Sequence, residues 1–125
     1  MKQAISTDKA PAAIGPYSQG IVAGSTLYIS GQIPVDPATG KISDSIEDQA
    51  KQSLTNISQI LAAYGLTMNN VVKTTVFLTD LNDFAAVNTI YAEFFEEPYP
   101  ARSCVEISKI PKGCKIEIEC IAAVN

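Results

Sequence analysis

The order of its strand-like and helix-like segments is the feature that most narrows what this chain can fold into. Short runs rich in β-branched residues alternate with two longer segments whose apolar residues recur at every third or fourth position. Along the chain the order is strand, strand, helix, strand, helix, strand, strand. The economical packing for this order is one sheet with two helices packed on one face, so we predict an α+β fold. We expect residues 1–125 to form a single domain, because domains of this length are common.

The first two strands are predicted to form a hairpin. Residues 17–23 and 26–30 are both β-rich, and they flank the dipeptide Gly24-Ser25. A glycine at the first position of a two-residue loop favours a type II′ turn. The preceding residues 1–16 contain two prolines and a glycine, which is typical of an extended or looped arm, and a short edge strand near Ala4-Ile5 is compatible with the pattern.

The first helix is predicted between a polar cap and a glycine. Asp44 or Ser45 can cap its start, and Gly65 is a typical C-terminal stop. One apolar face is expected, because apolar residues lie three and four positions apart. These residues are Ile46, Ala50, Leu54, Ile57, Leu61 and Tyr64.

The second helix is predicted after a buried strand at residues 71–78. Asp80 or Asn82 can cap this helix, and Pro98 prevents it from continuing. Its stripe of Phe84, Val87, Tyr91 and Phe94 is expected to pack into the core. With both helices on one face, the other face of the sheet keeps apolar residues such as Tyr28 and Ile121, which other subunits could bury.

Arg102 is the only arginine in the chain and lies in an alternating run after Pro100. The alternation predicts a strand on which Arg102, Cys104 and Glu106 share one face. A second alternating run at residues 115–121 carries Glu117 and Glu119 on one face, and the turn between the runs predicts a hairpin that places them side by side. From spacing alone this cluster is either a structural ion pair or a ligand site, because a guanidinium fits a carboxylate bidentately.

The composition excludes several classes of chemistry. There is no histidine, which removes the usual neutral-pH base and excludes a Ser-His-Asp triad or a Cys-His pair. The formal net charge of −4 argues against general nucleic-acid binding. The cysteines Cys104, Cys114 and Cys120 form no CxxC pair, which favours a reducing, cytoplasmic setting over a disulfide framework. We also expect no signal peptide and no membrane span.

Several segments in one order resemble the Rid family of reactive-intermediate deaminases, the YjgF type. The resemblance spans nearly the whole chain, and the strand at 72–78 and the helix start at 80–84 share in it. The segments that carry it most clearly are Gly15-Pro16-Tyr17-Ser18-Gln19, Ser30-Gly31-Gln32-Ile33-Pro34-Val35-Asp36, Pro100-Ala101-Arg102-Ser103-Cys104-Val105-Glu106 and Lys115-Ile116-Glu117-Ile118-Glu119.

This resemblance implies a chorismate-mutase-like fold assembled as a homotrimer, with the sites between subunits. It implies hydrolysis of 2-imino acids such as 2-iminobutanoate and 2-iminopropanoate to 2-oxo acids and ammonia, without metal or cofactor. Such imines arise from pyridoxal-phosphate enzymes that act on threonine and serine, and their removal would protect pyridoxal-phosphate enzymes from damage.

The resemblance also implies the roles of individual residues. Arg102 would hold the substrate carboxylate, and Glu117 would handle the water or the imine proton. Tyr17 would line the pocket from the neighbouring subunit. Ser30 and Gly31 would border the pocket, the backbone of Cys104 would help to bind the substrate, and Asn88 would lie near the cleft. The choice of Glu117 over Glu119 rests on the resemblance alone, because both lie on the same predicted face.

Two other functions remain open at this point. Similar proteins have been described as ribonucleases or translation inhibitors, against which the acidic charge and the lack of histidine count. A module that binds a 2-oxo acid or a protein partner without turnover is the other alternative. Turnover of an imine, degradation of RNA, and ligand binding without turnover distinguish the three.

Overall fold

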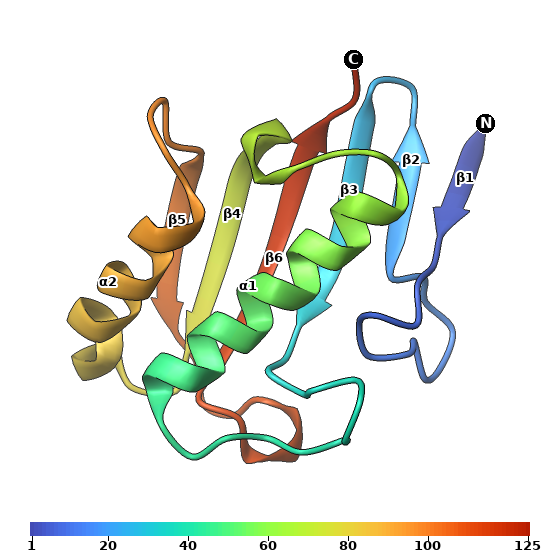
Figure 1. Ribbon diagram of the computed structural model, residues 1–125. Coiled ribbons are helices and arrows are strands. Elements are labelled where there is room, and N and C mark those ends of the chain that lie inside the picture. Colours follow the sequence, from blue (N-terminus) through green and yellow to red (C-terminus); the bar gives the residue numbers. More distant parts are fainter.

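The structure is a computed structural model that describes residues 1–125 and contains one mixed six-stranded sheet with two α-helices on one face (Figure 1). The strand order is β1-β2-β3-β6-β4-β5. This confirms the predicted α+β architecture. The elements are β1 (Lys2–Ile5), β2 (Gly20–Ala23), β3 (Thr26–Gln32), α1 (Ile46–Ala63), β4 (Val71–Leu78), α2 (Phe84–Phe94), β5 (Ala101–Glu106) and β6 (Ile116–Ala123).

The local turn and cap signals of the first half are confirmed. Gly24 has a φ of 61° and is followed by a residue with negative φ, the sign pattern of a type II′ turn between β2 and β3. Ser45 caps α1, because its side-chain oxygen accepts a hydrogen bond of 3.1 Å from the backbone N–H of Asp48. Gly65 follows the last turn with a φ of 73°, a conformation that glycine adopts without strain.

The core lies between the helices and the sheet. The largest fully buried side chains come from one face of α1 and from alternate residues of the central strands. They include Leu27, Leu54, Ile57, Ile60, Ile116 and Ile118. The opposite sheet face is not covered, and it exposes Tyr28 at 49%, Val72 at 50% and Val105 at 42%. The prediction that one sheet face lacks a helix is therefore confirmed.

The predicted hairpin between the last two strands is wrong. β5 pairs in parallel with β4, and β6 inserts between β3 and β4 in antiparallel register with both. A β4-α2-β5 connection through a helix is the crossover that parallel strands need. Residues 107–115, which include a 3₁₀ turn at Pro111–Gly113, then connect β5 to β6, and β6 lies on the other side of β4.

The start of α2 also differs from the prediction. Asp80 caps a 3₁₀ turn at Leu81–Asp83 by accepting from the backbone N–H of Asn82, and α2 begins only after that turn. Val87 and Tyr91 of the predicted stripe are buried, whereas Phe84 is 36% exposed. Phe84 and Tyr91 both lie against the Arg102 side chain, so the stripe has a second role beyond core packing.

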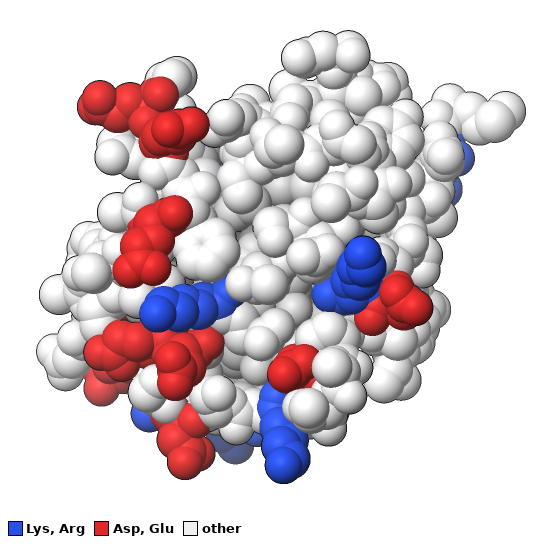
Figure 2. All heavy atoms as spheres, in the orientation of Figure 1, with Lys and Arg blue, Asp and Glu red and all other residues white.

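The helix-bearing face carries its acidic side chains mainly on the side where α2 lies (Figure 2). Basic side chains on that face are scattered among acidic and neutral ones and form no continuous patch (Figure 2).

Candidate active site

A large cleft brings four of the predicted site residues together. Tyr17, Ser30, Gly31 and Glu117 all line a cavity of about 900 Å³. Its walls come from the N-terminal arm, from the loop that follows β3 and from the turn before β6. Residues far apart in sequence therefore meet at this cleft, which has room for a small substrate and water.

Glu117 lies directly beside Gly31 in this cleft. A Cβ atom placed on Gly31 would lie 2.8 Å from Cδ and 3.1 Å from Cγ of Glu117, and closer still to Oε2. A larger residue at position 31 would displace the Glu117 carboxyl from this place. The register shift between Ile29 and Gln32, where β3 meets β6, produces this close approach of backbone and side chain.

Partial burial raises the pKa of the Glu117 carboxyl above its ordinary value, and the neighbouring charge of Glu119 adds to the shift. Glu119 itself is exposed and does not line the cleft. The structure thus distinguishes Glu117, which lines the cleft, from Glu119, which does not. The sequence pattern could not distinguish them, because both lie on the same strand face. A carboxyl with a raised pKa is suited to both donating and accepting a proton near neutral pH.

The hydroxyl of Ser30 is engaged with the backbone. Its Oγ donates a hydrogen bond of 2.6 Å to the carbonyl of Ser18, and its N–H donates to the carbonyl of Gln19 at 2.9 Å. These two bonds join the end of β3 to the loop that carries Tyr17. Tyr17 itself is 53% exposed and lines the same cleft as Glu117 of its own chain.

Two buried amides hold the walls of the cleft. Nε2 of Gln19 donates to the carbonyls of Thr7, Ala10 and Pro11 at 3.0, 3.3 and 2.8 Å, and its Oε1 accepts from the N–H of Thr7 at 2.7 Å. Asn56 of α1 holds the opposite wall. Neither residue was predicted from the sequence, because the groups that they hold are mostly backbone carbonyls.

Asn56 donates through Nδ2 to the carbonyls of Ile33 and Val35 at 3.2 and 3.1 Å. Its Oδ1 accepts from Gln52 at 2.8 Å, so the amide is fully engaged although it is completely buried. Because both clamps are neutral, the position of the walls does not depend on the ionisation of a carboxyl or an amine.

The other predicted residues lie together at the edge of the sheet. Nη1 of Arg102 donates a hydrogen bond of 2.7 Å to Oδ1 of Asn88, and its Cζ lies 4.8 Å from the ring centroid of Tyr91. The second ring, that of Phe84, is 5.2 Å away. The only hydrogen bond of this side chain within the chain goes to a neutral amide, and Arg102 forms no ion pair with a glutamate of its own chain.

Arg102 and Glu117 are far apart within one chain. Arg102 aligns with Thr74 and Glu117 aligns with Phe77, and β4 separates their strands. Two strand spacings and three residues along the strand give a Cα separation of about 14 Å. Glu117 alternates with the buried residues Ile116 and Ile118 and points to the open face, whereas Arg102 contacts α2 on the helix side.

Cys104 lies two residues from Arg102 and is partly buried. Burial raises the pKa of its thiol, an effect that the Arg102 charge partly opposes. All three cysteines are free thiols, and burial raises the pKa of Cys120 to about 12. A thiol in this state is a poor nucleophile at neutral pH.

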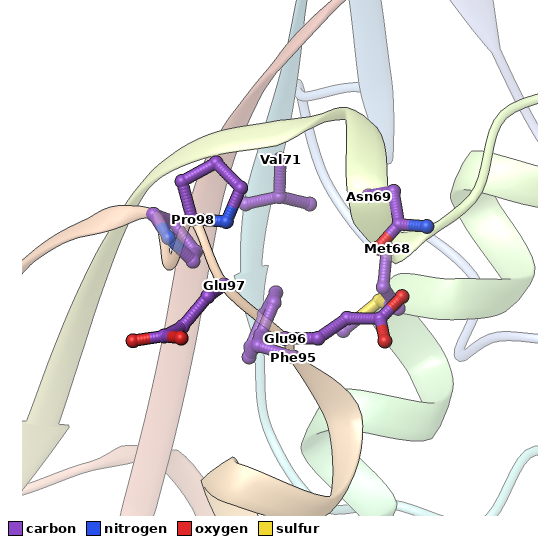
Figure 3. Close-up of a pocket in the computed structure, with 8 residues that line it drawn as sticks. Met68, Asn69, Val71, Phe95, Glu96, Glu97 and Pro98 are labelled. Atoms are coloured by element: carbon purple, nitrogen blue, oxygen red, sulfur yellow. The ribbon is translucent and has the colours of Figure 1, made fainter.

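A second, smaller pocket of about 260 Å³ lies near the C-terminal end of α2 (Figure 3). Met68, Asn69 and Val71 line it from one side, and residues 95–98 and Pro100 line it from the other. Glu96 and Glu97 are among its lining residues, but no basic residue and none of the predicted site residues line it. A pocket without a cation does not suit an anionic substrate.

No helix has the length and apolar character required to cross a membrane. The structure contains no group of three or more His, Cys, Asp or Glu side chains that could hold a metal ion.

The fold and the cleft thus define an α+β protein with a carboxyl-bearing site sized for a small molecule. The Endoribonuclease L-PSP family profile matches residues 7–124 of the chain. The chain therefore belongs to this family, which is also that of the YjgF/Rid proteins.

Named relatives cover the chain almost completely. It is 55% identical over 125 residues to a 2-iminobutanoate/2-iminopropanoate deaminase of Salmonella typhimurium, with 98% of each chain covered. A crystal structure of Escherichia coli TdcF with bound serine matches with a TM-score of 0.94 and 50% identity, covering 98% of this chain and 99% of that one. The crystal structure of RidA from an Antarctic Psychrobacter matches with a TM-score of 0.94 and 48% identity over 98% of this chain and 99% of the other.

Proposed function

We propose that this protein hydrolyses reactive 2-imino acids to 2-oxo acids and ammonia. The observation that carries the proposal is the 55% identity, over 98% of both chains, to a 2-iminobutanoate/2-iminopropanoate deaminase. The chemistry of the residues agrees with it, because a 2-imino acid offers a carboxylate to a guanidinium and a C=N bond that needs a proton and a water. Serine, which is bound in the related TdcF, is an α-amino carboxylate of similar size to 2-iminopropanoate.

In the proposed reaction Arg102 binds the substrate carboxylate through N–H donors that Asn88 does not use. Glu117, whose pKa is raised, supplies a proton to the imine nitrogen and accepts one from the attacking water. Water adds to the imine carbon, the C–N bond of the resulting carbinolamine breaks, and ammonia and the 2-oxo acid leave. Imines hydrolyse readily, so positioning of substrate and water accounts for much of the expected rate.

The proposal assigns the two groups of residues to different subunits of a homotrimer. Tyr17, Ser30, Gly31 and Glu117 would come from one subunit. The neighbouring subunit would contribute Arg102, Asn88 and the backbone of Cys104. This changes the division implied by the resemblance, because Tyr17 would stand on the same subunit as Glu117.

Two observations support assembly. The separation of Arg102 and Glu117 within one chain leaves each group incomplete. The open sheet face exposes Tyr28, Val72 and Val105, which a neighbouring copy would bury. Light scattering should give about 40 kDa, three times the chain mass of 13.3 kDa, and a mass near 13 kDa at micromolar concentration would contradict the trimer.

The activity is tested by an assay that generates 2-iminobutanoate in situ and follows its loss with and without the protein. We expect faster loss with the protein and release of 2-oxobutanoate and ammonia in equal amounts. Loss at the uncatalysed rate, together with binding of 2-oxobutanoate, would instead indicate a binding module. Degradation of RNA by chromatographically clean protein, without imine turnover, would support the nuclease that the family name describes.

A further inference from the structure

The guanidinium of Arg102 is held by residues from one stripe of α2. Phe84, Asn88 and Tyr91 lie at positions i, i+4 and i+7, so they share one face of that helix. Asn88 accepts a hydrogen bond from Nη1, and both rings lie within cation–π range of Cζ. A flexible arginine that is mostly exposed is thereby constrained on two sides.

Tyr91 is in turn held by Thr74. The two hydroxyl oxygens are 2.8 Å apart, and both residues are buried, Thr74 completely and Tyr91 with 6% exposure. Thr74 is also the residue of β4 that aligns with Arg102 of β5. The ring of Tyr91 and the backbone of Arg102 are therefore fixed to the same point of the sheet.

This hydroxyl pair has no other partner and takes no part in the proposed reaction. Burial raises the pKa of Tyr91, so its phenol stays neutral at physiological pH and adds no charge beside Arg102. On its remaining side the ring packs against Phe95, with centroids 4.5 Å apart. A rotation of the Tyr91 ring would change the surface on which the guanidinium rests.

We infer that Thr74 and Tyr91 are positioning residues for Arg102, which fix the plane of its guanidinium so that the donors left free by Asn88 are oriented for a ligand carboxylate. This inference rests on the proposed function, in which Arg102 binds the carboxylate of the substrate. It predicts an effect on carboxylate binding that exceeds the effect on the chemical step, because neither residue reaches the reacting atoms.

The test uses Tyr91→Phe, Thr74→Val and the double variant, with Tyr64→Phe as the matched control. Tyr64 follows α1 and its hydroxyl makes no side-chain hydrogen bond, so its loss should change nothing. Each single variant is expected to raise KM for the imino acid and Kd for 2-oxobutanoate by about 3- to 10-fold, with kcat changed by less than about twofold.

Thermal stability separates positioning from an ordinary core hydrogen bond. Each single variant leaves one buried hydroxyl without its hydrogen-bond partner. The double variant removes both hydroxyls and should regain Tm relative to Tyr91→Phe. A positioning role predicts that KM and Kd stay raised in the double variant although Tm recovers. Parental KM and Kd in all three variants, or recovery of KM together with Tm, would overturn the inference.

The lone arginine also allows a test that needs no substrate. In NMR spectra the only guanidinium signals come from Arg102, and we expect slow rotation about its terminal C–N bonds in the parent and faster rotation in Tyr91→Phe and Thr74→Val. Unchanged rotation in every variant would overturn the inference whatever the imine assay gives. If the parent shows no turnover and no binding of 2-oxobutanoate, the proposed function fails. The NMR result would then still decide whether Thr74 and Tyr91 restrict the motion of Arg102.

Discussion

The Arg102 region and the Glu117 region differ in how far their charged side chain is buried and in which groups hold it in place. Arg102 is exposed at an edge strand, and aromatic rings with one neutral amide hold it. Glu117 is partly buried in a cleft on a central strand, beside a glycine and within walls that buried amides hold in place. The Arg102 region keeps a permanent positive charge exposed, and the Glu117 region raises the pKa of a carboxyl.

The difference shows why neither region is a complete site alone. An exposed guanidinium binds a carboxylate weakly in water, because solvent screens the charge and competes for the hydrogen bonds. A partly buried carboxyl repels an anionic substrate when it is ionised. Joining the two regions at an interface would exclude water from the first and supply a balancing cation to the second.

The largest effect is expected when proton transfer by Glu117 is removed from the cleft. Glu117→Gln preserves the shape of the side chain but cannot exchange a proton, so kcat is expected to fall by about 100-fold or more. The Kd for 2-oxobutanoate should change much less. Glu119→Gln is the matched control on the same strand face. It removes a charge that adds to the raised pKa of Glu117 but no group of the cleft, so kcat should change far less than in Glu117→Gln. Equal losses in both variants, measured by steady-state assay, would mean that the two carboxyls act only through the local charge.

The opposite region is tested by Arg102→Lys. The charge remains, but an ammonium cannot offer the planar fork, and the lost charge-assisted hydrogen bond is worth roughly 1.5–3 kcal/mol. We therefore expect kcat/KM to fall by about 10- to 100-fold, with Kd for 2-oxobutanoate rising in parallel. If Arg102→Lys binds the 2-oxo acid and hydrolyses imines as the parent does, the guanidinium is not needed and the assignment of Arg102 as the carboxylate-binding residue fails.

The contribution of the cleft walls is tested by Gln19→Leu. The change removes the hydrogen bonds to residues 7–11 and leaves buried backbone groups unpaired, which should lower the free energy of unfolding by about 1–3 kcal/mol. A several-fold rise in KM is expected as the arm loosens, with the NMR signals of Arg102 unchanged. Gln59→Leu on α1, whose amide makes no hydrogen bond, is the control. A parental KM in a destabilised Gln19→Leu variant would show that the position of the N-terminal arm does not affect substrate binding.

A smaller effect concerns pH and stability. The folded chain raises the pKa of Glu117 above its ordinary value of about 4.3, so folding favours the protonated form. That contribution is fully present below the ordinary pKa and is lost as pH rises through the raised pKa. Urea midpoints at fixed protein concentration should show Glu117→Gln gaining stability relative to the parent over this window. A constant difference at all pH values would show that the carboxyl is not perturbed.

The smallest effect is expected at the thiols. Burial raises the pKa of each cysteine, and that of Cys120 reaches about 12, so little thiolate exists at neutral pH. Replacement of Cys104, Cys114 or Cys120 singly by alanine should leave most of the imine hydrolysis. Complete loss of turnover in one variant that still folds and assembles would reveal a nucleophilic thiol.

The sequence predicted those features of the fold that local interactions decide. Gly24-Ser25, the Ser45 cap and the Gly65 stop act within a few residues of themselves, and the structure has each where it was expected. The pairing of β5 was mispredicted because an alternating pattern defines a strand but not its neighbour. The helix-mediated crossover from β4 decides that pairing, and it depends on contacts across the whole sheet.

The site was predictable in part. Glu117 and Glu119 have the same spacing pattern, and only the bulge at Gly31 distinguishes the one that enters the cleft. Gln19 and Asn56 were missed because the partners they hold are backbone carbonyls, which no sequence pattern marks. Phe84 was assigned to the core because an aromatic stripe does not reveal which of its members faces a charge.

A site shared between subunits can be tested with mixed trimers of Arg102→Ala and Glu117→Gln chains, produced by co-expression with two different affinity tags. Each variant alone should be nearly inactive. If every site takes its arginine from one subunit and its glutamate from the next, each mixed trimer contains one intact site out of three. Purified mixed trimers should therefore recover about a third of parental activity, which corresponds to about a quarter of all sites in the unpurified random mixture. Mixed trimers, verified by mass, that remain as inactive as the separate variants would contradict a site shared between subunits.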